Sequence, residues 1–340
     1  MRLARLKGPG PTCFYHCLSR ITGGEFIFKT TGYGSGEAEY FVRLLHGLAA
    51  FSGITILTYA LMGNHFHILC EVPQPRLLSD PELLDRVEAL YGPERRNTDE
   101  RVLQGKTPGG ELAAQTLRRS YQARMFDLSR FLQELKSRFA QWYNRKHDRY
   151  GALWAERFKS LLVDGGVALT AVALYIDLNP VRAGLCADPK DYRYCGYGEA
   201  VGAGRLRAGL ARALGYDSQT GADWTEVQAA YRRLLYRTGV VSSQAGQAAL
   251  GLEAARRVVE QEQGALSWLE RLRCRLRFLT YGLVLGRRAF VEEQGARVRP
   301  RTTQHLREAG VTAGDPPDEK AVGGWFVWRR GRAVPVEESG

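Results

Sequence analysis

Two histidines, His65 and His67, flank a single residue in the segment Asn64-His65-Phe66-His67-Ile68. Side chains alternate between the two faces of a β-strand, so this spacing predicts both imidazoles on one face and Phe66 on the other. Two neutral imidazoles on one face suit a divalent metal ion. Taken alone, the pair is equally well explained by chance or by a hydrogen bond in the core, and the rest of the sequence must decide.

A second chemical element is the pair Tyr175 and Asn179, four residues apart and therefore on one face of a helix. A metal ion that polarises a phosphate oxygen makes phosphorus electrophilic, and a phenol that loses its proton can attack it. The product of such an attack is a covalent phosphotyrosine. By themselves, Tyr175 is more simply a core or surface tyrosine, and Asn179 a residue that ends a helix before Pro180.

Three segments carry a resemblance to a known family. They are Gly63-Asn64-His65-Phe66-His67-Ile68-Leu69, Leu153-Trp154-Ala155-Glu156-Arg157-Phe158-Lys159-Ser160 and Tyr175-Ile176-Asp177-Leu178-Asn179-Pro180-Val181-Arg182-Ala183-Gly184-Leu185. In this order they resemble the REP-associated tyrosine transposases of the HUH superfamily, which are insertion-sequence-like enzymes. The resemblance covers roughly residues 8 to 200, and its third segment is far more specific than His-Phe-His.

The resemblance implies an α+β fold, with a ferredoxin-like antiparallel sheet flanked by helices. It implies that His65, His67 and Asn179 bind Mg²⁺ or Mn²⁺ and that Tyr175 is the nucleophile. The implied activity is cleavage and rejoining of single-stranded or hairpin DNA, from repetitive extragenic palindromes or insertion-sequence ends. A 5′-phosphotyrosine and a free 3′-hydroxyl are the implied intermediates, and the bond energy kept in that link makes ATP unnecessary for rejoining.

Basic and aromatic side chains near these segments suggest contacts to DNA. Trp154, Arg157, Lys159 and Arg182 suit stacking on unpaired bases and contacts to phosphates. The alternative for all four is packing and solvated charge. For His16, which lies in the first expected strand, we favour a structural role over a metal-binding one.

The charge balance favours a polyanionic partner. Lys and Arg number 48 against 36 Asp and Glu, which gives a net charge of +12 and a pI near 9.5. An ordinary soluble basic surface is the alternative.

The six cysteines have no paired C-x-x-C spacing, so neither a disulfide framework nor a zinc module is predicted. With neither a signal peptide nor a long apolar run, we expect a cytoplasmic protein, a monomer or a homodimer, without membrane contact.

The apolar pattern predicts the elements that must position these residues. We expect strands at 11–20, 54–61 and 65–72, a strand or irregular edge at 152–163, and helices at 37–51, from the N-cap Asp127 onward, and from about 166 to 179.

We expect a catalytic domain over residues 1–200, interrupted at 73–122 by a polar excursion with one short helical pattern at 83–91. A mainly helical domain with a DNA-binding role is expected at 205–300, and a loosely ordered tail at 301–340. The helices expected in the domain at 205–300 are 224–236, 247–262, 267–281 and a shorter piece near 287–293.

Two other functions remain open from the sequence. One is a non-catalytic nucleic-acid-binding regulator on the same fold, against which the intact set of two histidines, tyrosine and asparagine argues. The other is a metal-dependent phosphodiesterase in which water attacks in place of Tyr175, which would leave no covalent adduct.

Overall fold

A four-stranded antiparallel sheet forms the centre of the molecule. The computed structural model describes residues 11–29, 36–216, 223–240 and 248–266 in full, and the backbone of three short strands beyond them. The sheet has the order β2-β3-β1-β4, with every neighbouring pair antiparallel. Its strands are β1 (Thr12–Arg20), β2 (Thr55–Leu61), β3 (His65–Pro73) and β4 (Lys159–Val163).

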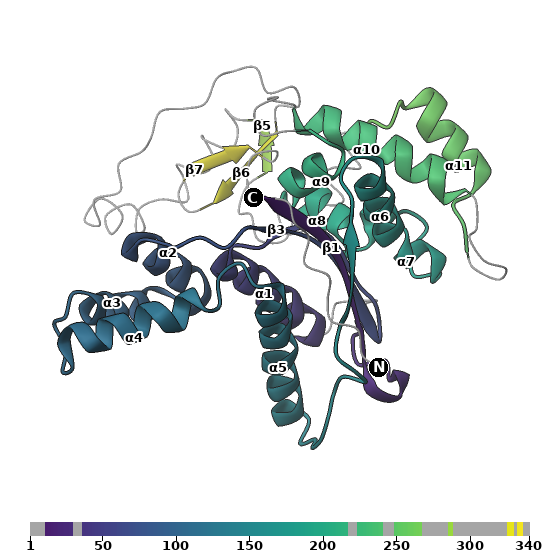
Figure 1. Cartoon of the computed structure of the whole chain (residues 1–340). Helices are drawn as coiled ribbons and strands as arrows, with labels where there is room; N and C mark the ends of the chain where they lie inside the picture. The colour runs from purple at the N-terminus through teal and green to yellow at the C-terminus, as the bar shows by residue number, and fades with distance from the viewer. Residues whose placement is uncertain are drawn as a thin grey trace.

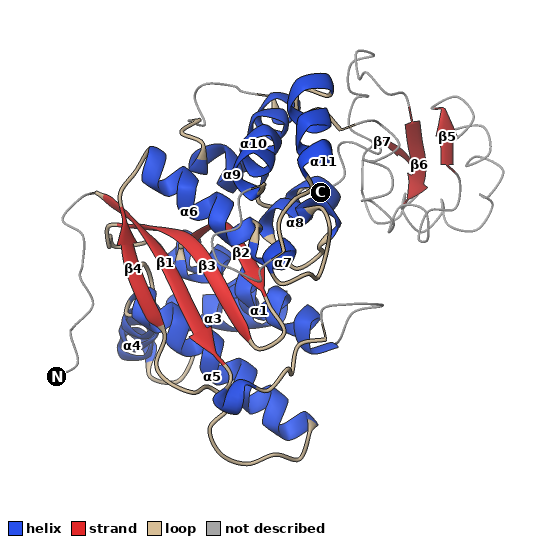
Figure 2. Ribbon diagram, turned by 90° about the vertical axis from the view of Figure 1, so that its right-hand side faces the viewer, coloured by secondary structure: helices blue, strands red, loops and turns tan. Residues whose placement is uncertain are grey.

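Helices cover both faces of this sheet (Figures 1 and 2). One face packs on α1 (Gly36–Ser52) and α5 (Leu128–Lys146), and the other on α6 (Val167–Asp177), α8 (Gly196–Gly202) and α9 (Arg207–Ala213). The chain order of strand, helix, two strands, helix and strand, with this sheet order, is that of a ferredoxin-like fold. The expected antiparallel sheet with flanking helices is therefore confirmed, as is the Asp127 cap, which accepts the backbone N–H groups of Ser129 and Arg130.

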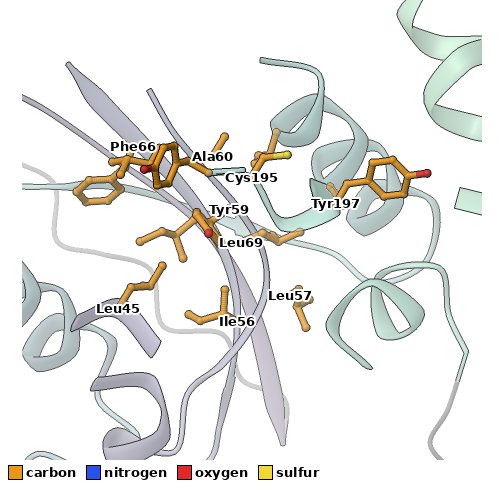
Figure 3. Packing of buried hydrophobic residues seen from close by; sticks show 14 of the residues in the cluster. Leu45, Ile56, Leu57, Tyr59, Ala60, Phe66, Leu69, Cys195 and Tyr197 are labelled. Carbon is orange, nitrogen blue, oxygen red and sulfur yellow. The ribbon is translucent and has the colours of Figure 1, made fainter. Parts of the chain in front are cut away.

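Apolar side chains fill both interfaces of the sheet. Leu45 lies on the α1 side, whereas Cys195 and Tyr197 lie on the α8 side, and all three are buried (Figure 3). The helix α8 lies unusually close to β2, because a Cβ at Gly196 would meet Thr58 Oγ1 at 2.0 Å. Only glycine permits this approach, which brings the α8 backbone within hydrogen-bonding reach of the α6 helix.

The polar excursion is more ordered than the sequence suggested. It contains three helices, α2 (Asp80–Tyr91), α3 (Pro93–Leu103) and α4 (Gly110–Gln122), where we expected one. They form a lobe with its own small core, made of Phe51, Leu78, Leu83, Val87, Tyr121, Met125 and Phe126. The two additional helices were missed because most of their residues are polar and because the Pro and Gly residues at their starts are typical of turns.

Helices beyond residue 205 pack on the same core as the sheet. The expected helix at 224–236 is α10 (Trp224–Gly239), and part of the next is α11 (Leu252–Arg256) with a π-helical turn, Arg257–Gln261. The side chains of Leu210, Tyr231 and Leu235 join the main cluster of buried residues. The division into domains at 200 and 205 stays a prediction, but over the described residues this core is continuous.

Of the remaining C-terminal region, the structure describes only the backbone of short strands. Helices expected at 267–281 and near 287–293 lie outside the described residues, except that Leu285–Arg287 forms a strand, β5. Two further strands lie in sequence that we expected to be a loosely ordered tail: β6 (Trp325–Arg329) pairs with β5, and β7 (Arg332–Pro335) pairs with β6. Within the described part of the chain, no helix combines the length and apolar character needed to cross a bilayer.

A buried carboxylate ties α6 to three other elements. Asp177 is fully buried and accepts hydrogen bonds from Thr58 Oγ1 of β2 (2.9 Å), the backbone N–H of Tyr197 in α8 (3.0 Å) and Tyr231 Oη of α10 (2.6 Å). Burial raises the pKa of Asp177 to about 6, and the three donors oppose that shift. The end of α6 is thereby held against the sheet.

Removing one donor from this carboxylate should lower stability. We expect Tyr231→Phe to reduce the free energy of unfolding by about 1.5 to 3 kcal/mol, because a buried charged acceptor loses a hydrogen bond. Urea denaturation at pH 7.5 measures the change. Tyr150→Phe is the control, since Tyr150 is 88% exposed, and it should leave the midpoint unchanged. Equal stability of Tyr231→Phe and the wild type would contradict this account of α6.

Candidate active site

The strand β3 presents its histidines on one face, as the spacing predicts. Phe66 points to the opposite face, where its ring lies 5.2 Å from Phe41 and 5.5 Å from Trp154. The rings of His65 and His67 lie 5.1 Å apart. The pair therefore faces α6 and not the α1 and α5 layer.

Cross-strand pairing adds two basic residues to the same face. Arg20 lies directly opposite His65, and the row through His67 continues across Leu18 to Lys159 on β4. Paired residues of neighbouring antiparallel strands share a face. Both Arg20 and Lys159 are exposed, so the histidines are flanked by positive charge that the solvent can reach.

Each of the two histidines has a partner for its Nδ1 atom. His67 Nδ1 lies 2.9 Å from His16 Nε2, with the two rings stacked at 5.2 Å, and His65 Nδ1 lies 2.7 Å from Asn64 Oδ1. Because Asn64 Oδ1 can only accept, His65 carries its proton on Nδ1, and its Nε2 presents a lone pair. The same arrangement holds for His67 when its Nδ1 donates to His16. His16 thus supports a candidate ligand, in agreement with the structural role expected for it.

Burial keeps both imidazoles neutral. Desolvation, with a smaller effect of Arg20, lowers the pKa of His65 to about 4. Desolvation also lowers the pKa of His67 to about 3, with smaller effects of His16, His65 and Arg20. At neutral pH both rings therefore hold a lone pair that can coordinate a cation.

Tyr175 of α6 stands above this group of histidines. Its ring lies 5.8 Å from that of His67 and 6.2 Å from that of His16, and the residue is 41% exposed. The guanidinium carbon of Arg182 lies 5.1 Å from the centre of the Tyr175 ring. Arg182 Nη1 is buried and has no hydrogen-bond partner among the described residues.

The Asn179 side chain is partly committed to its own helix. Its Nδ2 donates to the carbonyl oxygens of Tyr175 (2.9 Å) and Ile176 (3.3 Å), which closes the end of α6. This leaves Oδ1 as the atom available to a metal ion. We expected one helix to run from about residue 166 to Asn179. The helix α6 ends at Asp177, and Asn179–Arg182 forms a separate short helix, α7.

The four expected DNA contacts fall in different places. Arg182 lies beside Tyr175, and Lys159 lies on the histidine face in an ion pair with Glu156 (2.9 Å). Arg157 is exposed in the segment before β4. Trp154 lies on the opposite side of the sheet, where it packs on Phe66 and donates its Nε1–H to the carbonyl of Lys136 (2.9 Å), and its contact with DNA stays a prediction.

Sequence reasoning did not assign Arg20 to the site. Its signal was available, since Arg20 lies at an even position of a strand that also carries His16 and Leu18. What the sequence lacked was the pairing register, which places Arg20 opposite His65.

The donor set fits a divalent cation. His65 and His67 offer neutral Nε2 atoms, which transition metals bind, and Asn179 offers an amide oxygen, the donor type that Mg²⁺ and Mn²⁺ accept. Over the described residues, no three His, Cys, Asp or Glu side chains form a metal-binding group.

No protein-family model matches this chain, and no curated protein matches its sequence. Among solved structures, the chain is similar to one described as "Structure of the REP associates tyrosine transposase bound to a REP hairpin", with a TM-score of 0.38 and 13% sequence identity. The similarity covers 66% of this chain and 94% of the other. A similarity at this level does not assign an activity.

The low pKa of His67 predicts a pH dependence of stability. In the unfolded chain this imidazole titrates near 6.5, so between about pH 6 and pH 4 the unfolded state binds a proton that the native state does not. The free energy of unfolding should therefore fall with decreasing pH by up to about 1.4 kcal/mol per pH unit for this group. Urea denaturation of wild type and His67→Gln across this range measures it. If the free energies of unfolding of the two proteins changed with pH in parallel, His67 would not contribute to the pH dependence.

The partners of Nδ1 should contribute to metal affinity. We expect Asn64→Ala and His16→Ala each to weaken Mn²⁺ binding by about 10- to 100-fold, because each loses the group that orients a ligand ring. Isothermal titration calorimetry measures the affinity. His147→Ala is the control, since His147 pairs with Glu37 away from this face. An unchanged Mn²⁺ affinity in both variants would show that Asn64 and His16 do not support metal binding.

Proposed function

We propose that this protein cuts and rejoins single-stranded DNA, with Tyr175 as the nucleophile and Mg²⁺ or Mn²⁺ held by His65, His67 and Asn179. The observation that carries the proposal is the position of the half-exposed Tyr175 ring, 5.8 Å from the ring of His67, over two neutral histidines. A metal ion bound there would polarise a phosphate oxygen and make phosphorus more electrophilic.

The residues of the chain have separable tasks in this reaction. Arg182 has its guanidinium beside the phenol and would hold a phosphate oxygen. The Tyr175 phenol loses its proton, its oxygen bonds to phosphorus, and the bond from phosphorus to the 3′ oxygen breaks. The 3′ oxygen takes up a proton and leaves as a hydroxyl, and the 5′ phosphate stays on the tyrosine. Attack by a 3′-hydroxyl on this link reverses the steps and rejoins DNA.

A hairpin is the substrate class that the motif resemblance favours. The net charge of +12 and the basic residues Arg20 and Lys159 on the histidine face support binding of a polyanion. A location in the cytoplasm and a monomeric or dimeric state stay predictions. The second candidate, a non-catalytic regulator, would use the same basic face without the chemistry of Tyr175.

Formation of a covalent adduct is the decisive test. End-labelled hairpin DNA with a single-stranded flank is incubated with the protein and Mn²⁺, and denaturing gels detect label attached to protein. We expect an adduct with the wild type, and a loss of at least about 10³-fold with Tyr175→Phe, because the nucleophile is removed. Tyr150→Phe, which removes the hydroxyl of a tyrosine that is 88% exposed, is the matched control and should keep full adduct formation.

The other outcomes select among the alternatives. Cleavage without an adduct, retained in Tyr175→Phe, would indicate that water attacks and that the protein is a phosphodiesterase. Binding with neither cleavage nor adduct, across several hairpins and both metal ions, would favour the regulator.

A further inference from the structure

The loop after β1 exposes a large aromatic side chain. Phe26 is 79% exposed, although its neighbours Ile27 and Phe28 are 8% and 2% exposed. Burial of these two side chains anchors the loop, so the exposure of Phe26 is a property of a fixed segment. An aromatic ring held in water loses the free energy that burial would give it, and such a ring suggests a partner surface.

The Phe26 ring rests on the turn that precedes the histidines. A Cβ built at Gly63 would lie 2.5 Å from Phe26 Cδ1 and 3.2 Å from Cε1. The ring therefore occupies the space that any other side chain at position 63 would need. One side of the ring is covered by the Gly63 backbone, and the high exposure leaves the other side open.

Hydrogen bonds fix this loop to the candidate active site. Phe28 N–H donates to the Gly63 carbonyl (3.0 Å), and Asn64 Nδ2 donates to the Gly24 carbonyl (2.9 Å). The Oδ1 atom of the same Asn64 side chain accepts from His65 Nδ1 at 2.7 Å. A single amide thus links the loop that carries Phe26 to a candidate metal ligand.

A cation completes this corner of the sheet. Arg20 ends β1 in the position opposite His65 and is exposed. Phe26 therefore lies against Gly63, two residues before the candidate ligand His65, and Arg20 lies opposite His65 on the neighbouring strand.

We propose that Phe26 is a stacking platform for one unpaired base of single-stranded DNA, with Arg20 contacting the phosphate that adjoins it. This rests on the proposed function, because the base belongs to the strand whose phosphate is held at the histidines. An exposed ring face suits any of the four bases, and a base is free to stack on it only when it is unpaired. Phe26 would therefore help the site to select single-stranded over duplex DNA.

Binding to strands with and without bases tests this directly. The probes are fluorescein-labelled oligothymidine, an abasic strand of the same length and a duplex, and fluorescence anisotropy is measured without divalent ions so that no cutting occurs. For Phe26→Ala we expect about 5- to 100-fold weaker binding of oligothymidine, and unchanged binding of the abasic strand and the duplex. Phe26→Trp should retain wild-type affinity, and Leu112→Ala, an exposed apolar residue on α4, is the control.

A second variant reaches the same ring through the backbone. Gly63→Ala places a methyl group where the ring lies, so the flexible Phe26 side chain must move away. We expect a loss for oligothymidine similar to that of Phe26→Ala, with no further loss in the double variant. Thermal melting verifies that each variant is folded.

The outcomes separate this proposal from the cutting reaction. Equal binding of oligothymidine by wild type and Phe26→Ala, or an equal loss for the abasic strand, overturns the platform even if the Tyr175 adduct forms. A loss confined to strands with bases supports the platform even if no adduct forms, in which case the protein would be a single-strand-binding regulator.

Discussion

The hydrogen-bonded carboxylate of Asp177 is the interaction on which the arrangement of the site depends. It lies two residues after Tyr175 and accepts hydrogen bonds from β2, α8 and α10. A buried carboxylate is stable only where such donors satisfy it, so the elements that supply them must be in place together. The nucleophile candidate is consequently positioned by side chains far along the chain, including Tyr231, which follows the segment that resembles transposases.

The local part of the site could be predicted from the sequence. The alternation of His65, Phe66 and His67 follows from strand geometry, and the apolar pattern located the strand. The stacking of His16 on His67 could not be predicted, because it depends on the register between β1 and β3. Trp154 was assigned to DNA because its residue type suits base stacking. The side of the sheet on which it lies is set by tertiary structure and could not be predicted either.

Much of the fold was also predictable, with failures of two kinds. Strands and helices with strong apolar periodicity matched the expected ranges, including α1 and α10. Helices α3 and α4 were missed because their surfaces are mostly polar. The packing of α9 and α10 around the core of the central sheet was not predicted, because the glycine-rich segment near Gly202 is typical of a linker; Leu210 and Tyr231 belong to that core.

The lobe formed by α2, α3 and α4 leaves and rejoins the core at nearly the same point. Gln122 accepts the backbone N–H of Leu78 (3.3 Å) and donates to the carbonyl of Arg76 (2.5 Å), so one side chain joins the two ends of the insertion. In evolutionary terms, a segment with adjacent ends can lengthen, shorten or diverge without displacing the strands it interrupts. We therefore expect related chains to vary most in length and sequence in this lobe. The distances among His65, His67 and Tyr175 would stay the same.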